Sequence, residues 1–234
     1  MNRWVCEFVG TFCMVFAGTG AIMVDSMTGG QLGHVGVSLV FGLVVMVMIC
    51  AVGETSGAHL NPAVTIGFWL AGRFETSRIL PYLICQLAGA LLASVSLRGL
   101  FGAVASLGVT TPRFGSMQAF VVEIILSMIL MFVILRVSLD SRETGLFAAC
   151  AVGGTIALEA LLAGPICGAS MNPARSLAPA VVSGVFDGVW VYLVAPFVGA
   201  SLAVPLATLS LRERAKPSTK SSEEISWSKT LLKS

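Results

Sequence analysis

Charged side chains are scarce in this sequence. Only 11% of its 234 residues are Asp, Glu, Lys or Arg, less than half of the roughly 25% found in soluble domains. The formal net charge is +2, which is too small to favour binding to nucleic acid. Hydrophobic residues make up 56% of the chain, and its mean hydropathy is +0.91. This balance excludes an ordinary soluble domain and predicts a protein embedded in a lipid bilayer.

Several enzyme and metal-site signatures are missing as well. The chain has two histidines and contains no His-Glu-x-x-His, Gly-x-Ser-x-Gly or Walker sequence, the motifs of metalloproteases, hydrolases and nucleotide-binding loops. Its six cysteines form no Cys-x-x-Cys pair. Five of them lie in apolar segments, where a free cysteine acts as a small hydrophobic residue. We therefore predict no enzymatic activity, no metal ion and no cofactor.

Long apolar stretches are abundant, and they predict six membrane-spanning helices, because about 20 apolar residues cross the hydrocarbon core as a helix. The stretches of this length are 4–24, 34–52, 79–100, 117–137, 145–163 and 189–211. Two further apolar stretches, 61–71 and 172–182, are about half as long. We predict that each of these is a half-helix that enters the membrane and returns on the same side.

Both short stretches begin with Asn-Pro-Ala. Asparagine is a favoured N-cap, and proline is tolerated at the first helical position because its missing N–H would have no partner there. The two triplets are therefore predicted helix starts: Asn61, Pro62 and Ala63 in the first stretch, and Asn172, Pro173 and Ala174 in the second.

The two halves of the chain resemble each other. The segments 57–63 and 168–174 match at an offset of 111 residues, and Glu7 and Glu123 occupy similar places in the first and fourth spans. Each half holds three spans, an odd number, so the second copy enters the membrane upside down. We predict an all-α membrane protein with six transmembrane helices, two re-entrant half-helices and an inverted internal repeat. The channel domain would cover 1–211, with repeats of about 4–101 and 117–211, and a polar cytoplasmic tail would cover 212–234.

Basic residues predict the orientation in the membrane. Under this topology eleven of them face one side: Arg3, Arg73, Arg78, Arg136, Arg142 and the six in the tail. Only Arg98, Arg113 and Arg175 lie toward the other side. The positive-inside rule then places both termini in the cytoplasm.

Inversion brings the two Asn-Pro-Ala starts tip to tip at the middle of the bilayer. Irregular backbone at this depth persists only where it is buried in protein or lines a water-filled cavity, so we predict a pore. Its wall would include backbone carbonyls of the residues before each triplet, namely Gly57, Ala58, His59, Cys167, Gly168 and Ser170. Two helix N-termini aimed at one point repel cations. Asn61 and Asn172 would each donate to a passing water oxygen and interrupt proton hopping.

The sequences Ser-Gly-Ala-His-Leu-Asn-Pro-Ala-Val-Thr at 56–65 and Met-Asn-Pro-Ala-Arg-Ser at 171–176 resemble the two signature loops of the aquaporin, or major intrinsic protein, family. The resemblance covers about residues 4–210. It implies a passive channel for water and small uncharged solutes that excludes protons and ions. It also implies a homotetramer with one pore per subunit, located in the plasma or inner membrane of the cell.

The same resemblance implies a selectivity filter at Phe41, Ala160, Ala169 and Arg175. Water-selective members usually have histidine at the position of Ala160, so alanine predicts a wider and more apolar ring, while the charge of Arg175 keeps cations out. The segments 163–166 and 190–193 are similar to the nodulin-26-like branch and its bacterial relatives. That branch implies passage of glycerol, urea and neutral metalloid acids such as arsenous or boric acid. The aromatic Phe41 narrows the ring, and a strictly water-selective channel is the alternative.

The family resemblance also suggests that Glu7 and Glu123 hold the re-entrant loops by accepting backbone N–H groups. A proton relay in an ion-coupled transporter is a remote alternative. Glu54 and Glu159 could attract cations near a mouth, affect gating or pair with an arginine, and the sequence leaves these options open. His34 is either a simple interfacial residue or a pH-sensitive gate. The thiol of Cys167 is expected near the outer vestibule, where mercurials would reach it.

Overall fold

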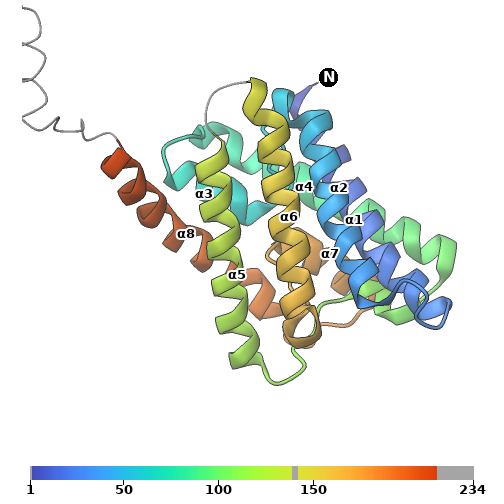
Figure 1. The fold of residues 1–234 in the computed structure, drawn as a ribbon. Coiled ribbons are helices and arrows are strands. Elements are labelled where there is room, and N and C mark those ends of the chain that lie inside the picture. Colours follow the sequence, from blue (N-terminus) through green and yellow to red (C-terminus); the bar gives the residue numbers. More distant parts are fainter. Residues whose placement is uncertain (1, 139–141, 215–234) are drawn as a thin grey trace, which may run out of the picture.

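The computed structural model describes residues 2–138 and 142–214 (Figure 1). Within these ranges the chain is helical and contains no strand. The elements in chain order are α1 (Arg3–Met27), α2 (Gly33–Ser56), α3 (Pro62–Leu70), η1 (Thr76–Arg78), α4 (Ile79–Phe101), η2 (Val104–Gly108), α5 (Ser116–Val137), α6 (Arg142–Cys167), α7 (Pro173–Ser183) and α8 (Val189–Arg214). Among them are six helices long and apolar enough to cross a membrane, and these correspond to the six predicted spans. The predicted fold class is confirmed.

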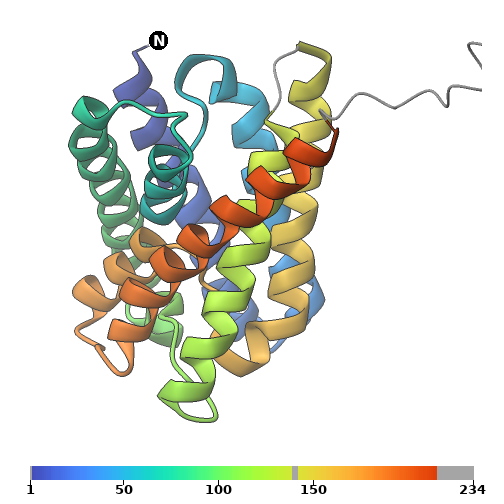
Figure 2. The same cartoon turned by 90° about the vertical axis from the view of Figure 1, so that its left-hand side faces the viewer.

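The two half-helices begin where the sequence predicts. The side-chain oxygen of Asn61 accepts the N–H of Ala63 at 2.9 Å, and that of Asn172 accepts the N–H of Ala174 at 3.0 Å. Each asparagine therefore caps the helix that follows it, and proline occupies the first helical position in both. The N-terminus and the C-terminal end of α8 lie toward the same end of the bundle (Figures 1 and 2).

Glycines allow the long helices to cross closely in matching places of the two repeats. A Cβ atom on Gly89 of α4 would lie 2.3 Å from the carbonyl oxygen of Phe8 on α1. A Cβ atom on Gly199 of α8 would lie equally close, 2.3 Å, to the carbonyl oxygen of Ile124 on α5. Small residues at such crossings let helix backbones approach within van der Waals contact, which is a main source of association energy in lipid.

The two repeats also meet through glycines. Helices α2 and α6 pack against each other, and a Cβ atom on Gly42 would lie 2.5 Å from the carbonyl oxygen of Gly153. The reverse contact, from Gly153 to the carbonyl oxygen of Gly42, would be 2.6 Å. The reciprocal distances are those expected of a pseudo-two-fold axis between the repeats.

The crossing at Gly199 should tolerate no side chain. Replacing Gly199 with valine places two methyl groups against the α5 backbone, and overpacking of this kind costs about 1–3 kcal/mol or more. We expect Gly199→Val to lower the thermal unfolding temperature of the detergent-solubilised protein.

Gly99→Val is the matched control. Gly99 lies in α4 and a Cβ atom there would meet no atom within 4 Å, so this variant should keep the wild-type unfolding temperature. Equal unfolding temperatures for the two variants would contradict the close crossing.

Candidate functional site

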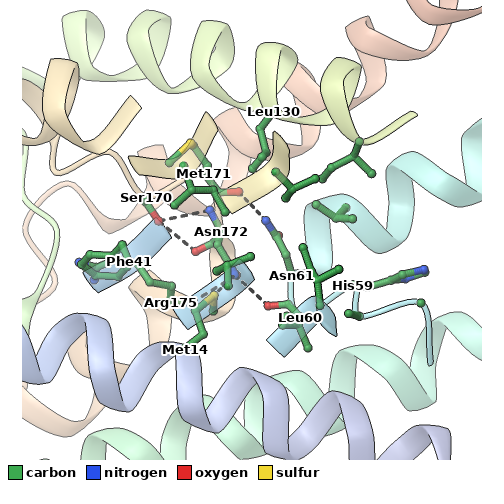
Figure 3. Close-up of a pocket in the computed structure, with 18 of the residues that line it drawn as sticks. Met14, Phe41, His59, Leu60, Asn61, Leu130, Ser170, Met171, Asn172 and Arg175 are labelled. Atoms are coloured by element: carbon green, nitrogen blue, oxygen red, sulfur yellow. Dashed lines mark hydrogen bonds between the residues drawn. The ribbon is translucent and has the colours of Figure 1, made fainter. Parts of the chain in front are cut away.

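The tips of α3 and α7 are joined directly by their capping asparagines. The amide nitrogen of Asn61 donates to the carbonyl oxygen of Met171 at 2.8 Å, and that of Asn172 donates to the carbonyl oxygen of Leu60 at 2.9 Å (Figure 3). Each bond crosses from one repeat to the other. A side-chain amide has two N–H groups, so this cross-brace uses one hydrogen of each asparagine. The second hydrogen of Asn172 has the sulfur of Met14 at 3.7 Å as a weak acceptor.

The loops before both tips have the same unusual backbone. In the first loop φ is +46° at Ala58 and +52° at Leu60, and in the second it is +42° at Ala169 and +54° at Met171. Residues with a side chain rarely adopt this left-handed region, and each such residue costs about 1–3 kcal/mol unless its surroundings enforce it. The two loops must therefore be held in place by specific partners.

A buried carboxylate holds the first loop. Oε1 of Glu7 accepts the N–H of His59 at 2.9 Å and the hydroxyl of Ser56 at 2.8 Å. Oε2 accepts the N–H of Leu60 at 2.8 Å and the side-chain amide of Gln86 at 2.8 Å. Glu7 is fully buried, so these four bonds replace its lost hydration.

A second carboxylate holds the other loop in the same way. Oε1 of Glu123 accepts the N–H of Ser170 at 2.7 Å, and Oε2 accepts the N–H of Met171 at 2.8 Å. The thiol of Cys167 donates to Oε1 at 3.3 Å. Consecutive N–H groups in a left-handed turn form a nest for an anion, and here a side chain fills each nest.

The two loops differ in the number of side-chain donors that their carboxylates have. Tyr82 donates its hydroxyl to the carbonyl of Ser56, and Tyr192 donates its hydroxyl to the carbonyl of Cys167, so these tyrosines are equivalent. Four residues after Tyr82 comes Gln86, a donor to Glu7, whereas four residues after Tyr192 comes Pro196, which has no donor. The second carboxylate thus has one side-chain amide fewer than the first.

Two cavities lie along the paired tips. The narrow cavity has a volume of about 90 Å³ and runs past both asparagines to Ser138, the residue after α5. The wide cavity has a volume of about 580 Å³ and opens beside Asp25 and His34, at the turn between α1 and α2. The last residues of α1 and the first residues of α5 lie at the same end of the helix bundle (Figure 1). The cavity beside Asp25 and the cavity that runs to Ser138 therefore reach opposite ends of the bundle.

Four residues line both cavities and therefore mark the place where the cavities meet. They are Phe41, Ala160, Ala169 and Arg175, the four positions expected to form the selectivity filter. We call this place the junction. It combines two methyl-sized side chains with one aromatic ring and one guanidinium group.

Arg175 is fixed at the junction by backbone and by an aromatic ring. Its Nη1 donates to the carbonyl oxygen of Gly108 at 2.8 Å, and its Cζ lies 4.9 Å from the centroid of the Phe41 ring, within the range of a cation–π contact. Only 3% of Arg175 is exposed. Within the described part of the chain no ion pair to Arg175 occurs. Its direct partners are therefore a backbone carbonyl and an aromatic ring, and not a carboxylate in an ion pair.

Most of the predicted pore-wall residues lie along the cavities. Gly57, Ala58 and His59 line the narrow cavity, together with Ser170. Gly168 lines the wide cavity. Their role in permeation stays a prediction.

Cys167 does not lie where the sequence suggested. It lines neither cavity and is fully buried. Its carbonyl accepts the hydroxyl of Tyr192 at 2.6 Å and its thiol faces Glu123. The residue supports the loop from behind, and the expectation of a pore-lining carbonyl and an accessible thiol is wrong.

The remaining polar residues have varied surroundings. Glu54 is exposed at the end of α2. Glu159 is 1% exposed, lines neither cavity and, among the described residues, has no hydrogen-bond partner at either carboxylate oxygen. His34 lines the wide cavity and its Nε2 donates to the carbonyl of Leu161 at 2.8 Å. Of the predicted tail, residues 215–234 lie outside the described residues.

Comparison with known proteins agrees with this geometry. The family model described as "Major intrinsic protein" matches residues 1–206. The chain belongs to the major intrinsic protein family. It is 50% identical over 200 residues to a probable aquaporin, NIP4-2, of Arabidopsis thaliana, across 85% of this chain and 70% of the relative. It is 44% identical over 201 residues to nodulin-26 of Glycine max, across 86% of this chain and 74% of the relative.

A solved structure is similar as well. The X-ray structure of the aquaglyceroporin from Plasmodium falciparum superposes with a TM-score of 0.77 at 30% identity, covering 88% of this chain and 98% of that one. The predicted resemblance to the nodulin-26-like branch is confirmed by the relatives. This aquaporin-family protein is a multi-pass membrane protein that forms a passive channel for water and small uncharged solutes.

The two loop-holding carboxylates should be needed for flux. In Glu7→Gln or Glu123→Gln an NH₂ group replaces one oxygen and faces N–H donors, and each lost hydrogen bond to a charged group is worth about 1.5–3 kcal/mol. We expect both variants to lower the osmotic water permeability of proteoliposomes and the unfolding temperature in detergent.

Glu159→Gln is the matched control, because it removes a buried carboxylate that accepts no hydrogen bond from the described residues. It should keep both measured values. A Glu7→Gln channel as active as wild type would show that the loop does not depend on this carboxylate.

Mercurial reagents should not act through Cys167. The thiol is enclosed behind the second loop, and a hydroxyl can replace it as Ser56 does in the first repeat. We expect Cys167→Ser to conduct water and to respond to a mercurial as wild type does. Protection of the variant from inhibition would place the thiol within reach of the passage.

Proposed function

We propose that this channel conducts glycerol, urea and neutral metalloid acids such as arsenous or boric acid in addition to water. The observation that carries the proposal is the composition of the junction. Two of its four members are alanines, Ala160 and Ala169, so the walls leave more width than a histidine would. The similarity to nodulin-26 and to a protein described as an aquaglyceroporin supports the same solute class.

Ions and protons are excluded in this proposal by fixed positive charge and by fixed donors. Arg175 contributes a full charge at the junction, and the N-termini of α3 and α7 contribute about half an elementary charge each at the tips. The four residues of the junction include no carboxylate that would offset this field. Asn61 and Asn172 orient a passing water by donating to its oxygen, which breaks the proton-conducting chain of hydrogen bonds. Glu7 and Glu123 serve as loop supports, because their oxygens are occupied by donors.

The assembly and placement follow from the family. We assign the channel domain to 1–211, with repeats of about 4–101 and 117–211, and a polar tail to 212–234. The protein would form a homotetramer with one pore per subunit in the plasma or inner membrane. The excess of arginine and lysine on one side favours cytoplasmic termini. The chain supplies no motif for catalysis, so the proposal is a channel without enzymatic activity.

Stopped-flow light scattering on proteoliposomes tests the solute class. Water, glycerol, urea and arsenous acid should all cross with no gradient of protons or sodium. Passage of water alone would favour the strictly water-selective alternative. Flux that requires an ion gradient would favour an ion-coupled transporter.

The variant Ala160→His should convert the channel toward water selectivity. Imidazole adds several heavy atoms and a donor at the junction, and size discrimination in a tight site is worth about 10–200-fold for one methylene. We expect glycerol flux to fall by at least about tenfold while water flux is retained. Unchanged glycerol flux would mean that Ala160 is not at the narrowest point.

A further inference from the structure

The Phe41 ring sits against a helix position that has no side chain. A Cβ atom on Gly18 of α1 would lie 2.1 Å from Cε1 of Phe41 and 2.5 Å from its Cδ1 and Cζ. Such distances are far below the 3.5–4.0 Å at which carbon atoms attract each other. The ring therefore occupies the volume that any side chain at position 18 would fill. Gly18 is buried and lines neither cavity.

The ring also contacts Arg175. Cζ of Arg175 lies 4.9 Å from the ring centroid, and Arg175 is itself anchored to the carbonyl of Gly108. Figure 3 shows Phe41 and Arg175 next to each other at one end of the cavity. With α1 against the ring and the guanidinium group fixed beside it, space next to the ring remains in the two cavities that meet at the junction.

We infer that Gly18 determines the solute specificity of the channel by forming a recess that holds the Phe41 ring back against α1, so that the ring lines the junction without extending further into it. An aromatic side chain at position 41 would otherwise narrow the passage to the width of water. Because the recess takes up part of the ring, larger neutral solutes such as polyols can pass although position 41 is aromatic. The inference rests on the proposed function and names a residue outside the four that line the junction.

A single methyl group tests the recess. In Gly18→Ala the ring has to move by more than about 1 Å to regain an ordinary carbon–carbon separation, and it moves into the junction. We expect glycerol flux to fall by at least about tenfold and water flux by less than about threefold in proteoliposomes, the range of size discrimination at a tight site. Gly20→Ala is the matched control. It lies on the same helix, its Cβ would meet Leu97 at 3.1 Å, and its ratio of glycerol to water flux should equal that of wild type.

The variant Phe41→Leu provides a second test. The smaller leucine side chain leaves room for the methyl group that Gly18→Ala introduces. Phe41→Leu should raise the ratio of glycerol flux to water flux by a larger factor in the Gly18→Ala background than in wild type. The two factors should differ at least about threefold. If Gly18→Ala alone does not fold, the double variant should fold and match the ratio of Phe41→Leu. A double variant with a much lower ratio than Phe41→Leu would overturn the inference.

The remaining outcomes separate the two proposals. A wild-type channel that passes glycerol, with an unchanged ratio in Gly18→Ala, would overturn the recess and leave the proposed function intact. A loss of glycerol flux that Phe41→Leu does not relieve would also overturn the recess. A wild-type channel impermeable to glycerol would overturn the proposed function, and the recess with it.

Discussion

Backbone N–H groups at membrane depth must find partners inside the protein, and in this channel two glutamates provide them. Lipid offers no hydrogen bonds, so a loop that dips into the bilayer would leave its N–H groups unpaired at a cost of several kcal/mol each. Glu7 and Glu123 accept those groups from behind the loops. Residues of both loops line the cavities on the other side. The strained backbone, the asparagine cross-brace and the passage all depend on these two buried charges.

Much of this arrangement could be predicted from local sequence. The lengths of the apolar stretches predict the six spans, and the two Asn-Pro-Ala triplets predict where the half-helices begin. The inverted repeat predicts that the tips of the half-helices meet. The four junction positions came from family resemblance, and the cavities meet at the same four residues. The predictions of the spans and of the helix starts are confirmed, because caps and span lengths are encoded by residues that are close together in the chain. The role of the four junction residues as a filter stays a prediction.

The errors and omissions concern contacts between distant segments. Cys167 was expected in the pore wall, but the left-handed turn that follows it rotates its carbonyl toward Tyr192. The anchoring of Arg175 by Gly108 was not foreseen, since η2 has no sequence signature and its backbone includes three consecutive left-handed residues. Nothing near Phe41 in the sequence indicated the contact with Gly18. Such contacts depend on how the helices pack, which local sequence does not specify.

The cavities on the two sides of the junction differ in volume, about 580 Å³ on one side and about 90 Å³ on the other. A passive channel cannot pump, so this shape produces no net flow between equal concentrations. It does give the channel two openings of different size and lining. A molecule too large to pass the junction can bind in the wide cavity beside Arg175. The narrow cavity on the other side of the junction is too small to hold it. Such a molecule therefore blocks the channel from the side of the wide cavity only. The potency of an inhibitor of this kind depends on the face of the membrane to which it is added.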